Sequence, residues 1–554
     1  MDDSGSVIDR AAGSLRRFRA VMTNPGLGRA VAAYAFFNFA EWATWIAVLV
    51  YAYERGGATE SGVVAFAMLV PATIVAPLAA GFADRVRRER ALLASYVVQA
   101  LVMAGAAIAL VVEAPSPVIY LLAAVTSTSV TLTRPAHGAI LPALSMSPSE
   151  LTSANVASGT VMNVSIMIAP AAAGLILNAS GAGAVFIVSA VGLAVGALLV
   201  MGIRTEQTSL DAEEEAPASG LRDVASGLTT LLRLPGPRTI VVLIGAAAAI
   251  EGALDVLIIV LAFDLLGTGE AGVGFLSSAA GLGGVVGAAA AMTLVGRKRL
   301  AVPFALGLLL WGVPIGMLGL LPTLALGLIL LCVAGVGRGL MDVAGRTLLQ
   351  RVTPDQSMGQ AFGAVEAAYM GMIAVGSIAV PAIIALTGPR QALIVVGLWM
   401  PVVIALVWRA LRRADAAAVV HVRELELLRG IRIFAPLPPP TIERLSARLV
   451  PVSVPAGEWV IRQGEAGDRY YIIDRGEAEV VIDGELLGAV NPGDGFGEIA
   501  LVREVPRTAS VRAKTDLGLF TLDRDVFLAA VAGHPESRTL AEDVVADRLA
   551  ASSR

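Results

Sequence analysis

The sequence predicts two parts: an all-α polytopic membrane domain of twelve helices in two six-helix halves, and a C-terminal β-roll, jelly-roll-like, with flanking helices. Hydrophobic residues make up 56% of the 554 residues and charged residues only 16%, whereas soluble chains average about 45–50% and 25%. Apolar runs that reach the roughly 20 residues needed to cross a bilayer follow one another as far as residue 409. After Arg413 the hydropathy falls, and short strand-like runs alternate with turns that contain Gly and Pro.

Each apolar run is expected to form a helix, because only helices and closed barrels satisfy every backbone N–H and C=O within lipid. The membrane domain is placed at 1–412, with halves at about 27–203 and 239–409 joined by a solvated loop, 204–238. A helical linker, 413–432, leads to the C-terminal domain, 433–554. The predicted spans are 27–53, 61–82, 90–112, 117–134, 152–178, 183–203, 239–263, 271–295, 300–321, 324–346, 360–385 and 391–409.

The basic residues predict the orientation of the membrane domain. Arginine and lysine gather at 85–90, 297–299 and 409–413, while the opposite loops hold few, such as Arg55 and Arg390. Because basic loops stay in the cytoplasm, both termini are expected there. The chain is therefore predicted to cross the cell membrane (inner or plasma) many times, with the lipid bilayer as its surroundings.

The two halves repeat each other in sequence. A shift of 210 residues aligns them without a gap from the first predicted helix to the loop after the second. The matched positions include Glu41 with Glu251, Glu60 with Glu270, and Arg87 with Arg297. Six-helix halves in parallel repeat are typical of a transporter whose halves rock about a central site.

The stretch from Gly81 to Arg88 holds a glycine, then Asp84-Arg85, then further arginines, and resembles the loop 2–3 signature of the major facilitator superfamily. It departs from that signature at Val86, because the glycine usual before the later arginines is missing. The resemblance covers the first 412 residues and implies secondary active efflux of a small molecule, usually proton-driven, without naming the cargo. Similarity to the drug-efflux branch that includes the enterobactin exporter lies at 134–136, 141–144, 154–155, 169–170, 174, 348–350, 353–355 and 359.

Three acidic residues lie inside predicted spans, where a charge costs at least ~2.5–3.5 kcal/mol on insertion scales. Glu41 lies near the middle of the first helix, and Glu251 and Asp255 lie four apart on one face of the seventh. The resemblance implies that helices 1, 4, 7 and 10 line a central cavity. We therefore expect Glu41, Glu251 and Asp255 to bind protons and a cationic or polar substrate in turn. The alternative is that they only hydrogen-bond to neighbours such as Trp45 or Asn38.

A second charged set is predicted near the cytoplasmic helix ends, where it could form a gate. Asp84 could sit at the N-terminal end of helix 11, where the helix dipole favours a carboxylate. The alternative is ordinary interfacial charge near the lipid headgroups. The predicted gate residues are Gly81, Asp84, Arg85, Arg134, Arg338, Asp342, Arg346 and Glu366.

The most specific motif is Phe496-Gly497-Glu498-Ile499-Ala500 followed by Arg507-Thr508-Ala509. It resembles the phosphate-binding cassette of cyclic-nucleotide-binding domains, and this resemblance covers about 430–550. Gly497 lets backbone N–H groups approach an anion closely, and Arg507 offers a charged fork to the cyclic phosphate. Glu498 is expected to accept a hydrogen bond from the ribose 2′-hydroxyl. The alternative is a β-roll that binds nothing.

The regulatory ligand is expected to be cAMP or cGMP, with cAMP preferred. Thr508 could bond the guanine amino group, which would favour cGMP, or could simply pack or bond the phosphate. The final helix is expected to act as a lid over the base. Strands are predicted at 452–454, 457–463, 470–474, 477–482 and 486–490, and helices at 414–428, 524–531 and 537–551.

The combined prediction is a membrane exporter of small molecules controlled by cytoplasmic cyclic nucleotide. The alternatives are a lipid or lysophospholipid transporter, or a receptor that has lost transport. No nucleophile–base set points to an enzyme, and one cysteine, Cys332, with three distant histidines predicts no metal site. The chain ends at Arg554 without room for a helix-turn-helix, so no nucleic-acid partner is expected. Cargo and oligomeric state stay open.

Overall fold

The computed structural model describes residues 23–85, 87–145, 148–203, 221–294, 297, 299–353, 358–417, 422–437, 439–532 and 534–552. They form two compact units: a helical unit that ends at Ala418 and a C-terminal unit that begins at Val419. Each unit buries its own apolar side chains.

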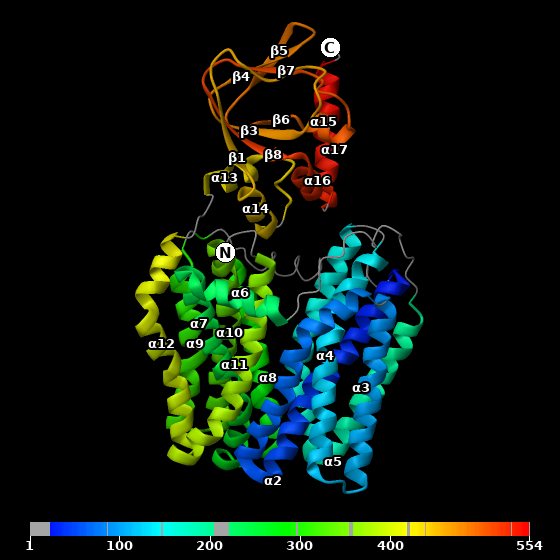
Figure 1. Ribbon diagram of the computed structural model, residues 1–554, viewed down its shortest axis with the longest axis vertical. Coiled ribbons are helices and arrows are strands. Elements are labelled where there is room, and N and C mark those ends of the chain that lie inside the picture. The colour runs from blue at the N-terminus through cyan, green and yellow to red at the C-terminus, as the bar shows by residue number, and fades with distance from the viewer. Residues whose placement is uncertain are drawn as a thin grey trace. The chain divides into compact units, whose positions relative to one another are not determined.

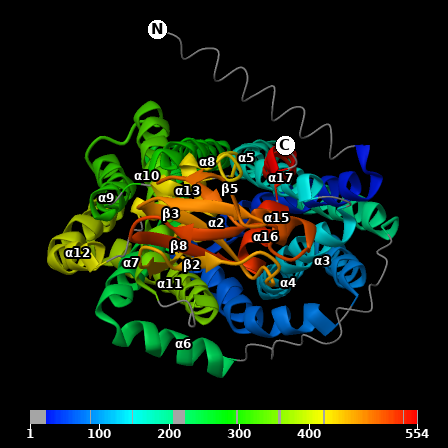
Figure 2. The same cartoon turned by 90° about the horizontal axis from the view of Figure 1, so that it is seen from above.

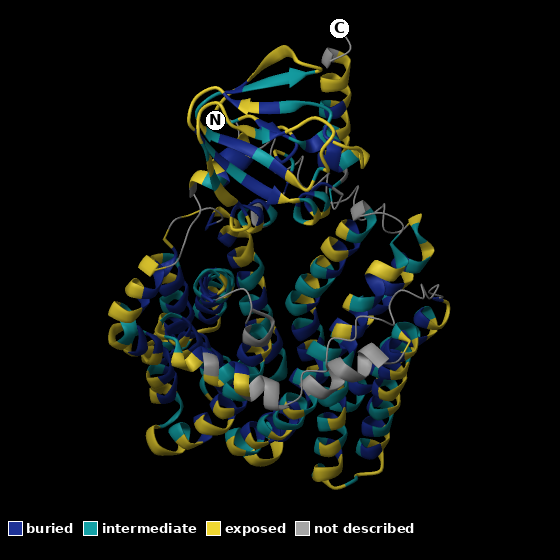
Figure 3. Cartoon of the chain, turned by 45° about the horizontal axis from the view of Figure 1, so that its top comes forward, coloured by how far each residue is buried: buried dark blue, intermediate teal, exposed yellow. Residues whose placement is uncertain are grey.

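Long apolar helices make up the helical unit, and ten in its described part are long and apolar enough to cross a membrane. Large apolar side chains such as Leu101, Leu198 and Leu406 are 63–79% exposed on their outer faces (Figure 3). Apolar surface of that extent faces lipid, so this is a multi-pass membrane protein. The helices are α2 (Pro25–Arg85), α3 (Arg88–Val111), α4 (Ser116–Leu144), α5 (Pro148–Met201), α7 (Pro235–Val260) continued by η2 (Leu261–Leu265), α8 (Gly269–Ala291) continued by η3 (Met292–Leu294), α9 (Ala301–Leu320), α10 (Leu324–Val352), α11 (Met358–Thr387) and α12 (Pro389–Ala417).

Two of these helices are about twice the length that a bilayer needs. The apolar spans within α2 and α5 run 51 and 52 residues, and each contains a break with non-helical backbone, at Gly56-Gly57 and at Gly181. Gly57 and Gly181 have φ of 63° and 74°, which glycine adopts without the steric cost of a Cβ. The count of twelve crossings, with a turn at each break, stays a prediction.

The helices gather in two groups, α2–α5 and α7–α12 (Figure 1). The groups touch close to the two breaks. A Cβ added at Gly62, just after the first break, would lie 2.4 Å from the Ser377 carbonyl of α11. A Cβ at Gly174, shortly before the second, would lie 2.7 Å from the Glu270 carbonyl of α8. The two halves are therefore closed against each other at this end of the bundle.

Inside the second half, α8 and α10 pack backbone to backbone. A Cβ added at Gly283 would lie 1.9 Å from the Cys332 carbonyl, and one at Gly335 would lie 2.0 Å from the Ala280 carbonyl. Real Cβ atoms do not come that close, so only glycine fits at these crossings.

A further helix, α6 (Leu221–Arg233), lies within the predicted solvated loop. It is strongly amphipathic; Leu228 and Leu231, three apart, pack toward the core, and α6 contacts α7 and α11 (Figure 2). The prediction of a loop is therefore wrong for 221–233, because leucines at helical spacing give this segment a face to bury. Residues 204–220 lie outside the described ones.

The C-terminal unit contains two antiparallel four-stranded sheets, ordered β1-β8-β3-β6 and β2-β7-β4-β5. Apolar side chains between the sheets, including Ile473, Val511 and Leu519, form one core. This matches the predicted β-roll. The strands are β1 (Val450–Val454), β2 (Trp459–Ile461), β3 (Arg469–Arg475), β4 (Ala478–Ile482), β5 (Glu485–Val490), β6 (Gly495–Phe496), β7 (Ser510–Ala513) and β8 (Leu517–Asp523).

Helices pack on one side of this roll around three aromatic rings. Tyr470 of β3 stacks on Phe527 at 4.8 Å, and Phe434 meets both rings edge-on. Of the predicted helix at 414–428, the end of α12 covers 414–417 and another helix begins at Val422, while residues 418–421 lie outside the described ones. The helices are α13 (Val422–Gly430), α14 (Pro439–Ser446), α15 (Glu498–Arg503), α16 (Arg524–Ala532) and α17 (Pro535–Ser552).

Candidate functional site

The first charged pair of the membrane unit joins α2 to α4. Arg134 Nη2 donates to both carboxylate oxygens of Glu41, at 2.9 and 2.7 Å. The predicted fourth span ends at Arg134, but α4 continues ten residues farther to Leu144. Arg134 therefore lies inside α4 rather than at its end, with an acidic partner that neutralises its charge, and its role in a gate stays a prediction.

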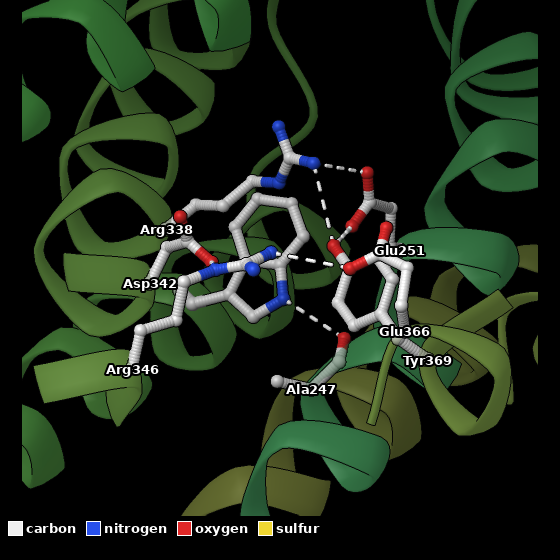
Figure 4. A network of polar contacts seen from close by, with 8 residues as sticks. Ala247, Glu251, Arg338, Asp342, Arg346, Glu366 and Tyr369 are labelled. Carbon is white, nitrogen blue, oxygen red and sulfur yellow. Dashed lines mark hydrogen bonds and ion pairs between the residues drawn. The ribbon is translucent and has the colours of Figure 1, made fainter. Parts of the chain in front are cut away.

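The second pair joins α7 to α10 and draws in α11 (Figure 4). Arg338 forms an ion pair with Glu251, and the Tyr369 hydroxyl donates to the other oxygen of the same carboxylate. Arg338 also lies 3.4 Å from the Tyr369 oxygen. Like Arg134, Arg338 is part of an acid–arginine pair; α10 extends to Val352 and places it near mid-helix, and its role in a gate stays a prediction.

The two pairs are equivalent by position in the repeat. Glu41 and Glu251 are 210 residues apart and lie on the first helix of each half, whereas Arg134 and Arg338 are 204 apart. Each arginine comes from the fourth predicted span of its own half. The side chains of Glu41 and Glu251 are 21% and 19% exposed, and those of the arginines 38% and 35%. Each half thus holds one nearly neutral, partly accessible ion pair.

Asp255 differs from both of these acids. It lies one helical turn beyond Glu251 and close to Trp45 of α2, which belongs to the other half. Among the described residues no arginine or lysine lies within 4.0 Å of its carboxylate. Asp255 is therefore the acid whose surroundings depend on how the two halves meet.

The remaining predicted gate residues fall into two groups. Arg346 donates to Asp342 at 2.8 Å within α10 and lies 3.5 Å from Glu366 of α11, so these three join two neighbouring helices (Figure 4). All three side chains are 43–52% exposed. Gly81, Asp84 and Arg85 belong to α2, but their side chains lie outside the described part of the chain.

The C-terminal unit contains a cavity of about 330 Å³, and all eight residues of the predicted cassette line it. The strand β6 ends at Phe496, Gly497 follows with φ of 96°, and α15 begins at Glu498. The positive φ of Gly497 turns the chain sharply enough for the start of α15 to face the cavity. The end of β6, Gly497 and the start of α15 therefore place backbone groups and side chains of the cassette together at one wall of the cavity.

Arg507 is held in the same wall by backbone carbonyls. Nη1 donates to Gly497 at 2.9 Å and Nη2 to Arg469 at 2.8 Å, and the side chain is only 2% exposed. Its nearest carboxylate, Asp468, lies 3.6 Å away and is 71% exposed. Burial lowers the pKa of the Arg507 guanidinium from its ordinary value, with Tyr471 and Asp468 opposing that effect. The wall therefore presents a fixed, weakly compensated positive charge.

Glu498 faces the cavity beside this arginine, and α17 reaches it from the other side. Arg548 donates to Glu498 Oε1 at 2.7 Å and to the Gly495 carbonyl at 2.8 Å. The Glu498 side chain is 1% exposed, and its second oxygen, Oε2, is buried without a hydrogen-bond partner among the described residues. A buried acceptor left unpaired is costly, so this oxygen is suited to a ligand hydroxyl.

The rest of the cavity wall is apolar, apart from Thr508, Asp494 and Arg548. The apolar residues come mainly from β2, β4, β5 and β7, and the shape suits a flat ring held by van der Waals contact. They include Ile461, Val480, Ile482, Leu487, Val490 and Val511.

Several contributing residues are missing from the sequence-based prediction. Tyr369 and Arg548 are identified only by the structure. Arg548 lies 50 residues from Glu498 in an ordinary helix, so no local pattern marks it. Tyr369 is a single polar group in an apolar run, which is a weak signal.

Comparison with known proteins supports the division of the chain into two parts of different families. The profile described as "Cyclic nucleotide-binding domain" matches residues 451–534, so the chain carries such a domain. Solved structures similar to this part include the regulatory domain of Toxoplasma gondii PKA with cAMP, at 32% identity over 20% of this chain and 44% of that one, with a TM-score of 0.20. A second is cAMP-bound PfPKA-R, at 25% identity over 25% of this chain and 52% of that one, with a TM-score of 0.22. A third is the sensor domain of the transcriptional regulator DNR from Pseudomonas aeruginosa, at 23% identity over 23% of this chain and 92% of that one, with a TM-score of 0.21. The chain spans about half the length of the first two.

The second profile covers the helical unit and extends past its end. It matches residues 30–300 and 246–454, overlapping stretches that together span most of the chain. The helices in two groups and the repeated acid–arginine pairs lie within these limits. The chain therefore belongs to the Major Facilitator Superfamily.

Proposed function

We propose that the chain is a proton-coupled secondary exporter of small molecules, regulated by cytoplasmic cyclic nucleotide, with cAMP preferred over cGMP. The observation that carries the transport part is the position of Asp255 close to Trp45 of the opposite half, with no arginine or lysine within 4.0 Å of its carboxylate among the described residues. The basic residues at 85–90, 297–299 and 409–413 support a cytoplasmic position for both termini in the cell membrane.

The Trp45 contact ties the proton affinity of Asp255 to the arrangement of the halves. When two halves rock, they separate on one side and close on the other, so a hydrogen bond between them forms in one state and breaks in the other. A carboxylate that loses a donor binds a proton more readily. A cationic group on the cargo competes with that proton for Asp255, which gives exchange of cargo for protons.

Glu41 and Glu251 have a different role in this proposal. Each is already paired with an arginine, and removing one partner would leave the other charge uncompensated inside the bundle. The pairs hold α4 to α2 and α10 to α7, so that each half moves as a body. They also keep the centre of the bundle close to neutral, which leaves Asp255 as the acid that exchanges its proton.

For regulation, the cavity of the C-terminal unit has residues suited to bind each part of a cyclic nucleotide. Arg507 and the backbone after Gly497 take the cyclic phosphate, and Glu498 Oε2 accepts from the ribose 2′-hydroxyl. Arg548 connects the ribose site to α17, so binding changes how α17 is held. A shift from 1:99 to 99:1 between transport states would need ~5.5 kcal/mol of differential affinity, so we expect tuning of the rate and not an on–off switch.

The choice of cAMP follows from the wall of the cavity. Guanine carries an oxygen, a ring N–H and an amino group that all need partners when buried. The wall offers Thr508 among mostly apolar side chains, which is a poorer match for guanine than for adenine. Both nucleotides share the phosphate and ribose contacts, so the preference rests on the base alone.

The test of transport uses the full chain in proteoliposomes with ethidium as a cationic probe and an imposed pH gradient. We expect gradient-driven ethidium efflux in the wild type and none in Asp255→Asn. Asp342→Asn is the control, because that carboxylate is half-exposed and already paired with Arg346. Full gradient-driven efflux by Asp255→Asn would overturn the coupling assignment. Regulation is tested separately by melting of the purified protein with cAMP and with cGMP, where only a larger shift with cAMP supports the preference.

One observation favours a second candidate, a lipid or lysophospholipid transporter. A cavity of about 340 Å³ between α3 and the second part of α5 is lined only by apolar side chains, including Ile108, Val111 and Val191. These three are 59–79% exposed, so an acyl chain could enter from the lipid. Movement of a fluorescent lysophospholipid between leaflets, abolished by Ala107→Trp, would favour this function over export of soluble molecules.

A further inference from the structure

The end of α12 is attached to the second half by a buried carboxylate. Asp415 is 4% exposed, although it lies two residues before the end of α12 and follows Arg412 and Arg413. Its Oδ1 accepts from the backbone N–H of Leu300, at 2.9 Å, and its carbonyl accepts from Arg299 Nη1 at 2.6 Å. Leu300 immediately precedes α9, so Asp415 caps the start of that helix from another element.

The neighbouring residue extends the same attachment to two more helices. Ala414 is 5% exposed, and a Cβ added at Gly236 would lie 3.9 Å from its Cβ and 3.6 Å from that of Val352. Gly236 belongs to the first turn of α7 and Val352 is the last residue of α10. The end of α12 therefore packs against the adjoining ends of α7, α9 and α10, all of which belong to the second half.

Beyond Ala417 the connection to the C-terminal unit is short. Four residues separate Ala417 from Val422, where α13 begins. Five backbone steps span at most about 18 Å when fully extended. At the other end α13 is part of the C-terminal core, because Leu428 is fully buried there and Arg423 Nε donates to Asp474 of β3 at 2.6 Å. A displacement of α13 beyond that reach must pull on the end of α12.

We infer that Asp415 is the positioning residue through which the nucleotide domain acts on the membrane unit, and that it directs the signal into the second half alone. This inference rests on the proposed function, since it needs a nucleotide-dependent signal. Without Asp415 the end of α12 would separate from α9, and movement of α13 would unwind α12 instead of displacing α7, α9 and α10. The Asp415 carboxylate therefore lets a movement of α13 displace α7, α9 and α10.

The test is hydrogen–deuterium exchange of the full-length purified protein, with and without saturating cAMP, followed in peptides that cover 299–305. We expect cAMP to change exchange there in the wild type. Asp415→Ala removes the cap, so the Leu300 amide should exchange about fivefold faster and lose its response to cAMP. Asp415→Asn keeps one carbonyl acceptor for the Leu300 N–H and should restore much of the response. A ten-residue Gly-Ser insertion after Ala417 should abolish the response while Asp415 stays bonded.

Affinity for cAMP, measured by calorimetry, separates the possible failures. It should be the same in the wild type and in all three variants, because none of the changes touches the cavity. If Asp415→Ala transmits the full wild-type change to 299–305, Asp415 is not the positioning residue and the proposed function stands. If the wild type binds cAMP but 299–305 do not respond, the route through the second half is wrong. If the wild type binds neither cAMP nor cGMP, regulation by nucleotide fails, and this inference fails with it.

Discussion

Arg548 lies 50 residues beyond Glu498 in the chain, yet its Nη1 donates a 2.7 Å hydrogen bond to the buried Glu498 carboxylate. This contact joins the last helix to the wall that also contains Gly497 and Arg507. It leaves Glu498 Oε2 as a buried acceptor without a hydrogen-bond partner in the described part of the chain. A ligand hydroxyl at that oxygen would complete the bonding of a carboxylate that α17 already holds.

We predict that Arg548→Ala destabilises the C-terminal unit and weakens cAMP binding. The change leaves the buried Glu498 carboxylate without its arginine partner, which costs about 1–3 kcal/mol. The melting temperature of this unit in the full-length protein, read by differential scanning fluorimetry, should fall. Adding Glu498→Gln to Arg548→Ala should recover much of that loss, because the buried charge is gone. Equal losses in the single and double variants would show that the pair is not coupled.

Arg507→Ala should reduce the affinity for cAMP by at least about 100-fold, since two charge-assisted bonds of about 1.5–3 kcal/mol each are removed. Isothermal titration calorimetry measures this directly. Arg507→Lys is the matched control: it keeps the charge but loses the fork that bonds Gly497 and Arg469, and should bind with intermediate affinity. If Arg507→Ala binds cAMP with the wild-type affinity, the cyclic phosphate does not bind at this wall.

The acid–arginine pairs predict a non-additive pattern. Arg338→Met alone leaves Glu251 in the bundle without its cation and should lower the stability of the helical unit, by less than the ~3–5 kcal/mol of a fully buried pair because this pair is partly accessible. Arg338→Met with Glu251→Gln should be far closer to the wild type, as removal of both charges leaves none unpaired. Thermal unfolding in detergent, monitored by circular dichroism, gives the comparison. Additive losses would argue that the two side chains do not depend on each other.

Gly335→Ala should destabilise the second half, because its Cβ would lie 2.0 Å from the Ala280 carbonyl. Overpacking of that kind costs typically ~1–3 kcal/mol. Gly284→Ala is the matched control, since the nearest atom to its Cβ would be 4.0 Å away, at the Gly335 carbonyl. Melting temperatures of the two purified variants should differ by several degrees. Similar melting would mean that α8 and α10 can move apart at little cost.

The sequence predicts the helical unit and the β-roll well because hydropathy and turn residues are local signals. Glu41 and Glu251 are identified by the repeat, but their arginines are not, since Arg134 and Arg338 are six residues out of the 210-residue register. A charge also makes a natural end for an apolar run, so the predicted fourth span stops at Arg134. Only the contact with Glu41 explains why α4 continues to Leu144.

The cassette is predicted because its chemistry is continuous in sequence, and all eight of its residues line one cavity. Three strands next to it are missing from the prediction for different reasons. β6 has only two residues, too few for any alternation, while β7 and β8 follow the cassette without a pronounced turn signal. Arg548 escapes because a contact between residues 50 apart in the chain leaves no trace in local spacing.

The backbone contact of α8 with α10 constrains how this family member could adapt to bulkier cargo. The backbones of α8 and α10 are in contact at Gly283 and Gly335, so any larger side chain at either position forces the two helices apart. Any widening of the second half would therefore have to come from helix pairs other than α8 and α10.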